Sequence, residues 1–165
     1  MRQEQPHSLR IRSVQPTSAA ARRMSDALWT EIQRRYGFAA PNPFDPDVFA
    51  TERSGFWIAF DGDEPVGSIA LAALDERRAE LDAMYVVPAR RRSGIAGALM
   101  AQVEAHARKN GTTQIVLRAG APQPEALEFY RAAGFTPIER FGRWTDDNTA
   151  ACFGKAVDKA VPSGG

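Results

Sequence analysis

The feature that most constrains the fold is a strand, a glycine-bearing loop and a helix in direct succession between residues 84 and 109. An apolar run over 84–87 ends at Pro88, and a basic loop follows. The spacing of Ile95, Leu99, Val103 and Ala107 then predicts a helix from Ile95 to Lys109. A helix start carries unpaired N–H groups and partial positive charge, and Gly94 lets a ligand approach the backbone. The unit therefore predicts an anion site.

Further strands and helices are predicted on both sides of this unit, in an order that mixes local strand pairing with crossovers. Strands are predicted at 9–14, 56–60, 66–74, 79–87, 115–117, 136–141 and 150–157, with helices between Pro16 and Gly37, at 95–109 and from Pro124 to Gly134. A short helix near 47–51 lies in an otherwise irregular segment, 38–55. This order predicts a mixed three-layer α/β sheet in a single domain, 9–157, between a loose start, 1–8, and a tail, 158–165.

Composition narrows the class of protein. With 165 residues, one domain with a full core is expected. A formal net charge of +1 argues against a nucleic-acid partner. A lone cysteine, Cys152, and two histidines argue against a disulfide or a metal site. The first residues lack the apolar core of a signal peptide, and no apolar run is long enough to span a membrane, so we expect a cytoplasmic protein.

The basic loop resembles a known signature. Arg91-Arg92-Ser93-Gly94-Ile95-Ala96 is similar to the acetyl-CoA pyrophosphate loop of the GCN5-related N-acetyltransferases, the GNAT superfamily: Arg or Gln, two residues, Gly, one residue, then Gly or Ala. The predicted element order is similar to the GNAT fold over residues 9–157, with specific motifs at 80–99 and 117–135. The resemblance implies a mixed central sheet of about six to seven strands, splayed in the middle and flanked by about four helices.

The same resemblance implies acetyl-CoA as cosubstrate, and no metal. The backbone of Tyr85, Val86 and Val87 would bind the pantetheine arm, because splayed strands leave N–H and C=O groups in need of partners. The backbone N–H groups of the loop would hold the pyrophosphate; they belong to Arg92, Ser93, Gly94, Ile95, Ala96 and Gly97. The run Arg90-Arg91-Arg92 would add charge-assisted bonds to cofactor phosphates, the alternative being a solvated basic loop. Family members usually carry Gly at the position of Arg92, so its presence predicts that no positive φ is needed there.

A second signature contains a tyrosine that is a candidate catalytic residue. Many GNAT members have Asn, two residues, Ala, three residues, Tyr, three residues, Gly-Phe; here Gln123 replaces the Asn, while Ala126, Tyr130, Gly134 and Phe135 match. The resemblance makes Gln123 and Tyr130 cofactor contacts, and makes Tyr130 the general acid that protonates the departing thiolate. The alternative is a core tyrosine at ordinary helical spacing.

Amine attack also calls for a base, since an alkylamine is mostly protonated at pH 7. Glu80, six residues before Val86, matches the glutamate base of the histone-acetylating members, and Asp82 is a competing base. Strand alternation predicts Glu80, Asp82 and Met84 on one face, with Ala83 on the other. The alternative is a pair of surface carboxylates.

The implied reaction is direct acetyl transfer, in a ternary complex, from acetyl-CoA to a primary amine of a small molecule or peptide. The resemblance places the acceptor between segments 36–55 and 141–149. Transfer of another acyl group or to oxygen, and a non-catalytic acyl-CoA-binding or regulatory module, are the alternatives. Dimers are common in the family, so a homodimer is a further possibility.

Overall fold

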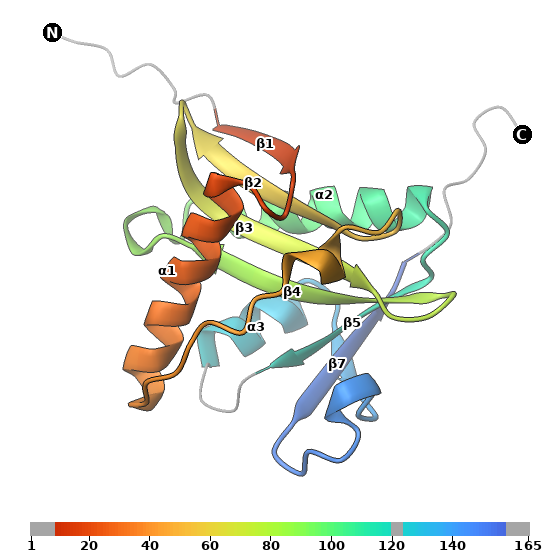
Figure 1. Ribbon diagram of the computed structural model, residues 1–165. Coiled ribbons are helices and arrows are strands. Elements are labelled where there is room, and N and C mark those ends of the chain that lie inside the picture. The colour runs from red at the N-terminus through yellow and green to blue at the C-terminus, as the bar shows by residue number, and fades with distance from the viewer. Residues whose placement is uncertain (1–8, 120–123, 158–165) are drawn as a thin grey trace, which may run out of the picture.

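The computed structural model describes residues 9–119 and 124–157, which form a mixed seven-stranded sheet of order β1-β2-β3-β4-β5-β7-β6 (Figure 1). The strands are β1 (Leu9–Val14), β2 (Gly55–Asp61), β3 (Glu64–Ala73), β4 (Arg78–Val86), β5 (Gln114–Ala119), β6 (Thr136–Ile138) and β7 (Ala151–Ala156). A strand lies at each of the seven predicted places, although the sixth is shorter than predicted. The predicted loose start 1–8, the tail 158–165 and the predicted cofactor contact Gln123 lie outside the described residues.

Helices cover both faces of the sheet. The α-helices are α1 (Ala19–Tyr36), α2 (Ile95–Lys109) and α3 (Pro124–Ala132), and short 3-10 helices span η1 (Pro46–Phe49), η2 (Pro88–Arg90) and η3 (Gly142–Trp144). The described residues thus hold three α-helices rather than about four, and the short helix predicted near 47–51 is η1. Helix α1 lies on one face over β3 and β4, while α2 and α3 lie on the other (Figure 1). None of the described helices is long and apolar enough to cross a membrane.

Two apolar cores hold these layers together. The core under α2 contains the fully buried Leu99 and Val103 together with Ile69 and Ile115 of the sheet. The core under α1 joins Met24 to aromatic and aliphatic residues of β2 and β3. Burying one such aliphatic side chain contributes about 1.5–3 kcal/mol, so packing against the sheet stabilises each helix in its place.

Gly67 of β3 sets how closely the start of α2 approaches the sheet. A Cβ at this position would lie 2.9 Å from Cγ2 of Ile95 and 3.1 Å from Cδ1 of Leu99. Only a residue without a side chain allows that approach. The N-terminal turn of α2, which carries the predicted anion site, is therefore positioned by the sheet itself.

The sheet splays between its two parallel strands. β4 and β5 pair only at Arg78 with Gln114, Ala79 with Ile115 and Glu80 with Val116. Beyond Glu80, β4 continues to Val86 along β3, whereas β5 continues along β7. The facing edges of the two strands therefore separate past Glu80, as the resemblance to the GNAT fold implied.

A β-bulge in β4 corrects the predicted strand alternation. Ser68 of β3 pairs with Tyr85, but Ala70 pairs with Asp82, so β4 holds one extra residue. Ala83 has a φ of 53°, and its carbonyl accepts a hydrogen bond of 2.7 Å from the Ser68 hydroxyl. The bulge turns Met84 toward the α2 core and Ala83 toward the α1 core. The prediction that Met84 shares a face with Glu80 and Asp82 is wrong.

The last hairpin is shorter than predicted. The strand expected over 136–141 ends at Ile138, because the chain turns into η3 at Gly142, whose φ is 50°. Phe141 is buried against Val116 and Cys152 in a third small core. This turn brings the β6–β7 loop back over β4, where Trp144 of the loop contacts Glu80.

Candidate active site

The loop before α2 ends in an uncapped helix start. Gly94 has a φ of 86°, and no side chain caps the helix. The N–H of Ala98 donates to the Gly94 carbonyl at 3.1 Å, so the N–H groups of the preceding turn have no helical acceptor. A Cβ placed on Gly94 or on Gly97 would meet nothing within 4 Å. The first turn therefore offers free donors to open space.

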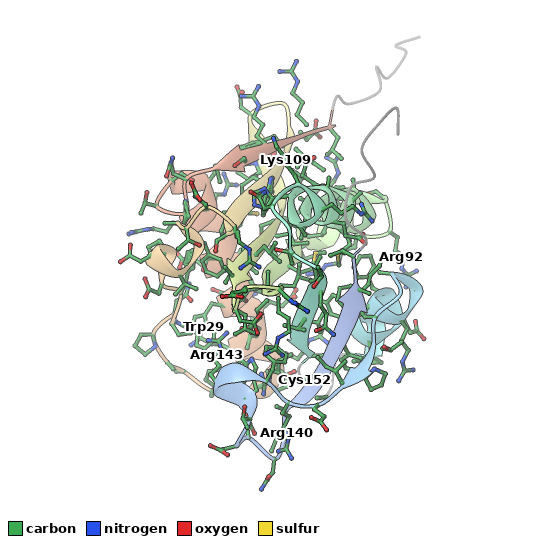
Figure 2. The ribbon with its side chains drawn as sticks, turned by 90° about the vertical axis from the view of Figure 1, so that its right-hand side faces the viewer. Trp29, Arg92, Lys109, Arg140, Arg143 and Cys152 are labelled. Carbon is green, nitrogen blue, oxygen red and sulfur yellow. The ribbon has the colours of Figure 1, made fainter. Side chains whose placement is uncertain are left out.

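Arg92 departs from the sequence prediction. Its φ is 65°, so the backbone there is left-handed, and the expectation that this position needs no positive φ is wrong. A left-handed backbone at a residue other than glycine costs free energy. The Arg92 side chain is exposed, and no acidic side chain among the described residues pairs with it (Figure 2).

The other two arginines of the run are engaged within the protein. Arg90 pairs with Asp61 at the end of β2. Arg91 lies 2.7 Å from Glu31 of α1, donates from Nε to the Val86 carbonyl at 2.9 Å, and lies over the Tyr85 ring. These contacts fasten the loop to the sheet and to α1, which leaves Arg92 as the arginine of the run without such a contact.

The three predicted backbone positions of β4 have different surroundings. The Val87 N–H donates to the Val66 carbonyl at 3.0 Å, so it is used within the sheet. Val86 pairs with Gly67, and its carbonyl carries the hydrogen bond from Arg91. The Tyr85 side chain is buried in the α1 core, where burial raises the pKa of its phenol.

Tyr130 of α3 lies against the opposite face of the sheet, in aromatic surroundings. Its ring contacts Phe129 and Phe135 with centroids 5.6 and 5.7 Å apart. No described residue forms a hydrogen bond with its hydroxyl. Burial, and then the negative charge of Asp82, raise the pKa of Tyr130 to about 12. The phenol is therefore a neutral donor throughout the usual pH range.

Asp82 is the first carboxylate beyond the last pair of β4 with β5. Enclosure by protein, and then the charge of Glu80, raise the pKa of Asp82, although the N–H of Ala83 and the charge of Arg143 oppose that shift. Solvent still reaches 45% of the side chain, so the carboxylate lies at the open side of an otherwise enclosed position. Its negative charge is the second cause of the raised pKa of Tyr130, which packs in the core on the other face of the sheet.

Glu80 is held by the β6–β7 loop. Its Oε2 accepts a hydrogen bond of 3.0 Å from the Trp144 indole N–H and one of 3.4 Å from Arg143. Only 13% of the Glu80 side chain is exposed. The two carboxylates share the α1 face, since their partners on β3, Ala72 and Ala70, both belong to the α1 core.

Two arginines that the sequence did not single out complete the cluster. Arg118 of β5 and Arg143 of η3 lie over the Trp144 ring, 4.7 and 4.4 Å from its centroid. Arg118 also lies 3.9 Å from Asp147. Arg143 is 63 positions from Glu80 in sequence, and no local pattern announces that contact. Cys152, on the neighbouring strand, is buried, and burial raises the pKa of its thiol (Figure 2).

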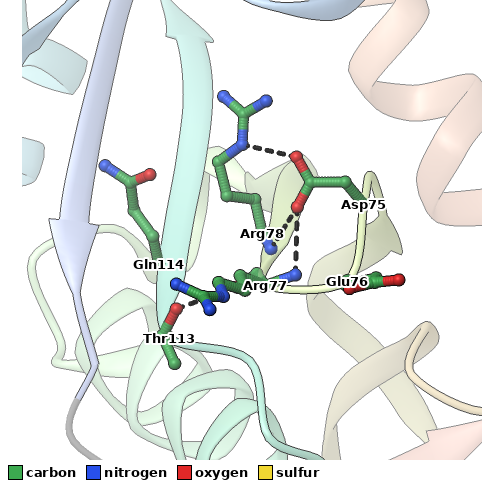
Figure 3. A pocket seen from close by; sticks show the side chains of 6 residues that line it. All are labelled: Asp75, Glu76, Arg77, Arg78, Thr113 and Gln114. Atoms are coloured by element: carbon green, nitrogen blue, oxygen red, sulfur yellow. Dashed lines mark hydrogen bonds and ion pairs between the residues drawn. The ribbon is translucent and has the colours of Figure 1, made fainter.

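A separate concave surface lies at the other end of the β4–β5 pair (Figure 3). Its centre is Asp75, which accepts hydrogen bonds from the backbone N–H groups of Arg77 and Arg78 and pairs with the Arg78 side chain at 2.7 Å. These bonds lower the pKa of Asp75. Because this surface flanks the paired end of the strands, it is remote from the splay and from Tyr130.

The splay therefore brings together an uncapped helix start, a phenol without a hydrogen-bond partner and a carboxylate pair. This set offers backbone donors for an anion, a proton donor and a proton acceptor. Among the described residues, no group of three His, Cys, Asp or Glu side chains is placed to hold a metal ion.

Comparison with known proteins decides the family. The sequence model "Acetyltransferase (GNAT) family" matches residues 22–135. The chain belongs to the GNAT acetyltransferase family. Members of this family use acyl-CoA. The chain is 32% identical over 94 residues to "Uncharacterized N-acetyltransferase YsnE" of Bacillus subtilis, covering 56% of this chain and 62% of that protein.

Solved structures agree on the fold. A putative acyl-CoA N-acyltransferase from Klebsiella pneumoniae matches with a TM-score of 0.77 at 20% identity, covering 93% of this GNAT chain and all (100%) of that one. The PaiA N-acetyltransferase of Thermoplasma acidophilum, solved in complex with coenzyme A, matches with a TM-score of 0.69 at 17% identity, covering 90% of this chain and 99% of that one. The prediction of a GNAT fold is confirmed.

Proposed function

We propose that this protein transfers an acetyl group from acetyl-CoA directly to a primary amine in a ternary complex. The observation that supports the proposal is the separation of β4 from β5 past Glu80, where Asp82 lies on the α1 face of the sheet and Tyr130 packs on the other face. A neutral phenol on one side of the splay and a carboxylate on the other form an acid and a base suited to one reaction. Acetyl-CoA supplies the activated thioester carbonyl.

The donor side fits the pyrophosphate of acetyl-CoA. The unpaired N–H groups of Ile95, Ala96 and Gly97 would hold the phosphates, since a helix start favours anions. Gly94 and Gly97 leave the space over this turn open. Arg92, exposed and without an acidic partner, would add a charge-assisted bond. Val86, on the stretch of β4 that has left β5, would offer its backbone to the pantetheine arm.

The acceptor side supplies the proton chemistry. An amine entering from the α1 face would meet Asp82 and Glu80, and the carboxylate pair would take its proton. Asp82 is the better placed base, because it lies past the last β4–β5 pair and its charge acts on Tyr130. Tyr130, on the opposite face, would give a proton to the departing sulfur. The acid and the base thus act from opposite sides of the splay.

Thermal unfolding with acetyl-CoA tests the donor site. Because a ligand that binds only the native state stabilises it, acetyl-CoA at about 100 times its Kd should add about 2.7 kcal/mol. Pantetheine, which lacks the nucleotide and pyrophosphate, serves as the control and should give a much smaller rise in Tm. Thiol release from acetyl-CoA across a panel of primary amines then tests transfer. No rise in Tm at millimolar acetyl-CoA, or no amine-dependent thiol, would overturn the proposal.

Gly97→Ala separates cofactor binding from stability. Ala is favoured over Gly inside a helix by about 1 kcal/mol, and the added methyl group meets no protein atom within 4 Å. We therefore expect a higher Tm for the free protein. The methyl group would occupy space over the pyrophosphate turn, so the Kd for acetyl-CoA should rise about tenfold. Calorimetric titration beside thermal unfolding checks both signs, and an unchanged Kd would remove this turn from the donor site.

A further inference from the structure

One guanidinium nitrogen bridges both carboxylates of the site. Nη2 of Arg143 lies 3.4 Å from Oε2 of Glu80 and 3.5 Å from Oδ2 of Asp82. The Arg143 side chain is 62% exposed, whereas that of Glu80 is only 13% exposed. The anionic partners are thus more firmly enclosed than the cation between them. A cationic nitrogen already occupies the position that an acceptor ammonium would need.

The charges of the cluster restrict what can replace that nitrogen. An alkylammonium that displaced the guanidinium from Glu80 and Asp82 would leave Arg143 without an anionic partner among the described residues. Asp147 of the β6–β7 loop pairs with the other arginine of the cluster, Arg118, at 3.9 Å, so it is already engaged. An acceptor that carries its own carboxylate would avoid this loss. Its ammonium would bind Glu80 and Asp82 in place of Arg143, and its carboxylate would bind Arg143 in place of Glu80 and Asp82.

Trp144 keeps Arg143 next to the carboxylates during such an exchange. The indole is fixed through its N–H, 3.0 Å from Oε2 of Glu80, and the guanidinium groups of Arg143 and Arg118 both lie over its ring. The Arg143 guanidinium can therefore turn on this aromatic surface without leaving the site. A planar guanidinium also matches a carboxylate through two parallel hydrogen bonds, which a lysine cannot provide.

We propose that the acceptor is an amine with an adjacent carboxylate, such as a free α-amino acid, whose ammonium binds Glu80 and Asp82 and whose carboxylate binds Arg143. This inference rests on the proposed acetyl transfer. In the transfer, the nitrogen forms one bond to the acetyl carbon as the carbon–sulfur bond breaks. The ammonium loses two protons in all: the carboxylate pair passes one to solvent, and the other replaces the proton that Tyr130 gives to the sulfur. Arg143 acts in substrate binding and takes no proton.

Three matched acceptors test the carboxylate requirement: phenylalanine, its amide and phenethylamine, with leucine, its amide and isopentylamine as a second series. Thiol release gives kcat/KM for each. We expect the wild-type protein to prefer the amino acids over their amides and amines by about 10- to 100-fold. Arg143→Gln should bring this ratio close to one, and Arg143→Lys should restore part of it.

Arg140→Gln is the matched control. Arg140 lies on the same loop, but its guanidinium donates to the Asp147 carbonyl and to Asn148, away from the carboxylate pair. The variant removes the same charge and should keep the wild-type ratio. Equal use of acids and amides by the wild type, or an unchanged ratio in Arg143→Gln, would overturn this inference and leave acetyl transfer standing. No thiol release from any compound of either series would overturn the proposed function.

Discussion

Replacing Tyr130 with Phe is expected to lower kcat by about 10²- to 10⁴-fold, the usual contribution of a positioned proton donor. The phenol suits that role because no described residue hydrogen-bonds its hydroxyl and its pKa is raised to about 12. It stays protonated at every ordinary assay pH. The ring of a Phe would keep the contacts with Phe129 and Phe135. Steady-state kinetics with saturating acetyl-CoA measures the effect.

Binding and stability must stay constant for that result to mean catalysis. The hydroxyl forms no hydrogen bond with the described residues, so Tyr130→Phe should leave Tm nearly unchanged, and the Kd for acetyl-CoA should move by less than about twofold. A kcat within twofold of wild type would assign Tyr130 to the core alone.

Local signals explain why so much of the donor side is predictable from sequence. Helix α2 begins at Ile95 and ends at Lys109 as predicted, because Gly94, the apolar spacing and Asn110-Gly111 all act within a few residues. The α1 end at Gly37 follows for the same reason: its φ of 70° suits the left-handed helix cap that glycine favours. The first turn of α2, and with it the candidate pyrophosphate site, rests on such short-range rules.

Long-range contacts explain what the sequence left open. The bulge at Ala83 contains no glycine and depends on a hydroxyl from the next strand, Ser68. Arg92 adopts a positive φ in a loop held by ion pairs of its neighbours with Glu31 and Asp61, 60 and 29 residues away. Such pairings follow from the tertiary fold, and single-residue patterns do not encode them.

The carboxylate pair shows how these two kinds of information combine. Strand alternation correctly placed Glu80 and Asp82 on one face, yet gave no reason to prefer either. The structure ties Glu80 to Trp144 and Arg143, and leaves Asp82 at the start of the splay. We favour Asp82 as the base, because its side chain is 45% exposed whereas that of Glu80 is 13% exposed and held by the Trp144 indole.

Asp82→Asn is therefore expected to lower kcat/KM by about 10²- to 10⁴-fold near neutral pH. An alkylamine is neutral in only about one molecule in a thousand at that pH, so the transfer depends on a group that takes its proton. The raised pKa of Asp82 should shift the acid limb of the wild-type pH–rate profile to higher pH than an ordinary aspartate would give. The Asp82→Asn variant should lose this limb. Glu80→Gln should keep that limb and mainly raise KM for the acceptor.

The pH dependence of thermal stability gives an independent test of the raised pKa of Asp82. Because the folded-state pKa of Asp82 is raised, the native protein binds the proton more tightly than the unfolded chain does. The ionised carboxylate therefore destabilises the fold as pH rises through the interval between the two pKa values. Asp82→Asn should have the higher Tm at pH 7.5, and this gain should vanish well below about pH 4, where Asp82 is protonated in both states.

The matched control is Asp63→Asn, in the exposed turn between β2 and β3, which should leave the pH–rate profile unchanged. An Asp82→Asn protein that keeps the acid limb of the wild-type profile would exclude Asp82 as the base. If Glu80→Gln abolished that limb instead, the proton would go to Glu80, and the ion pair of Arg143 with Glu80 would then have to open before each turnover.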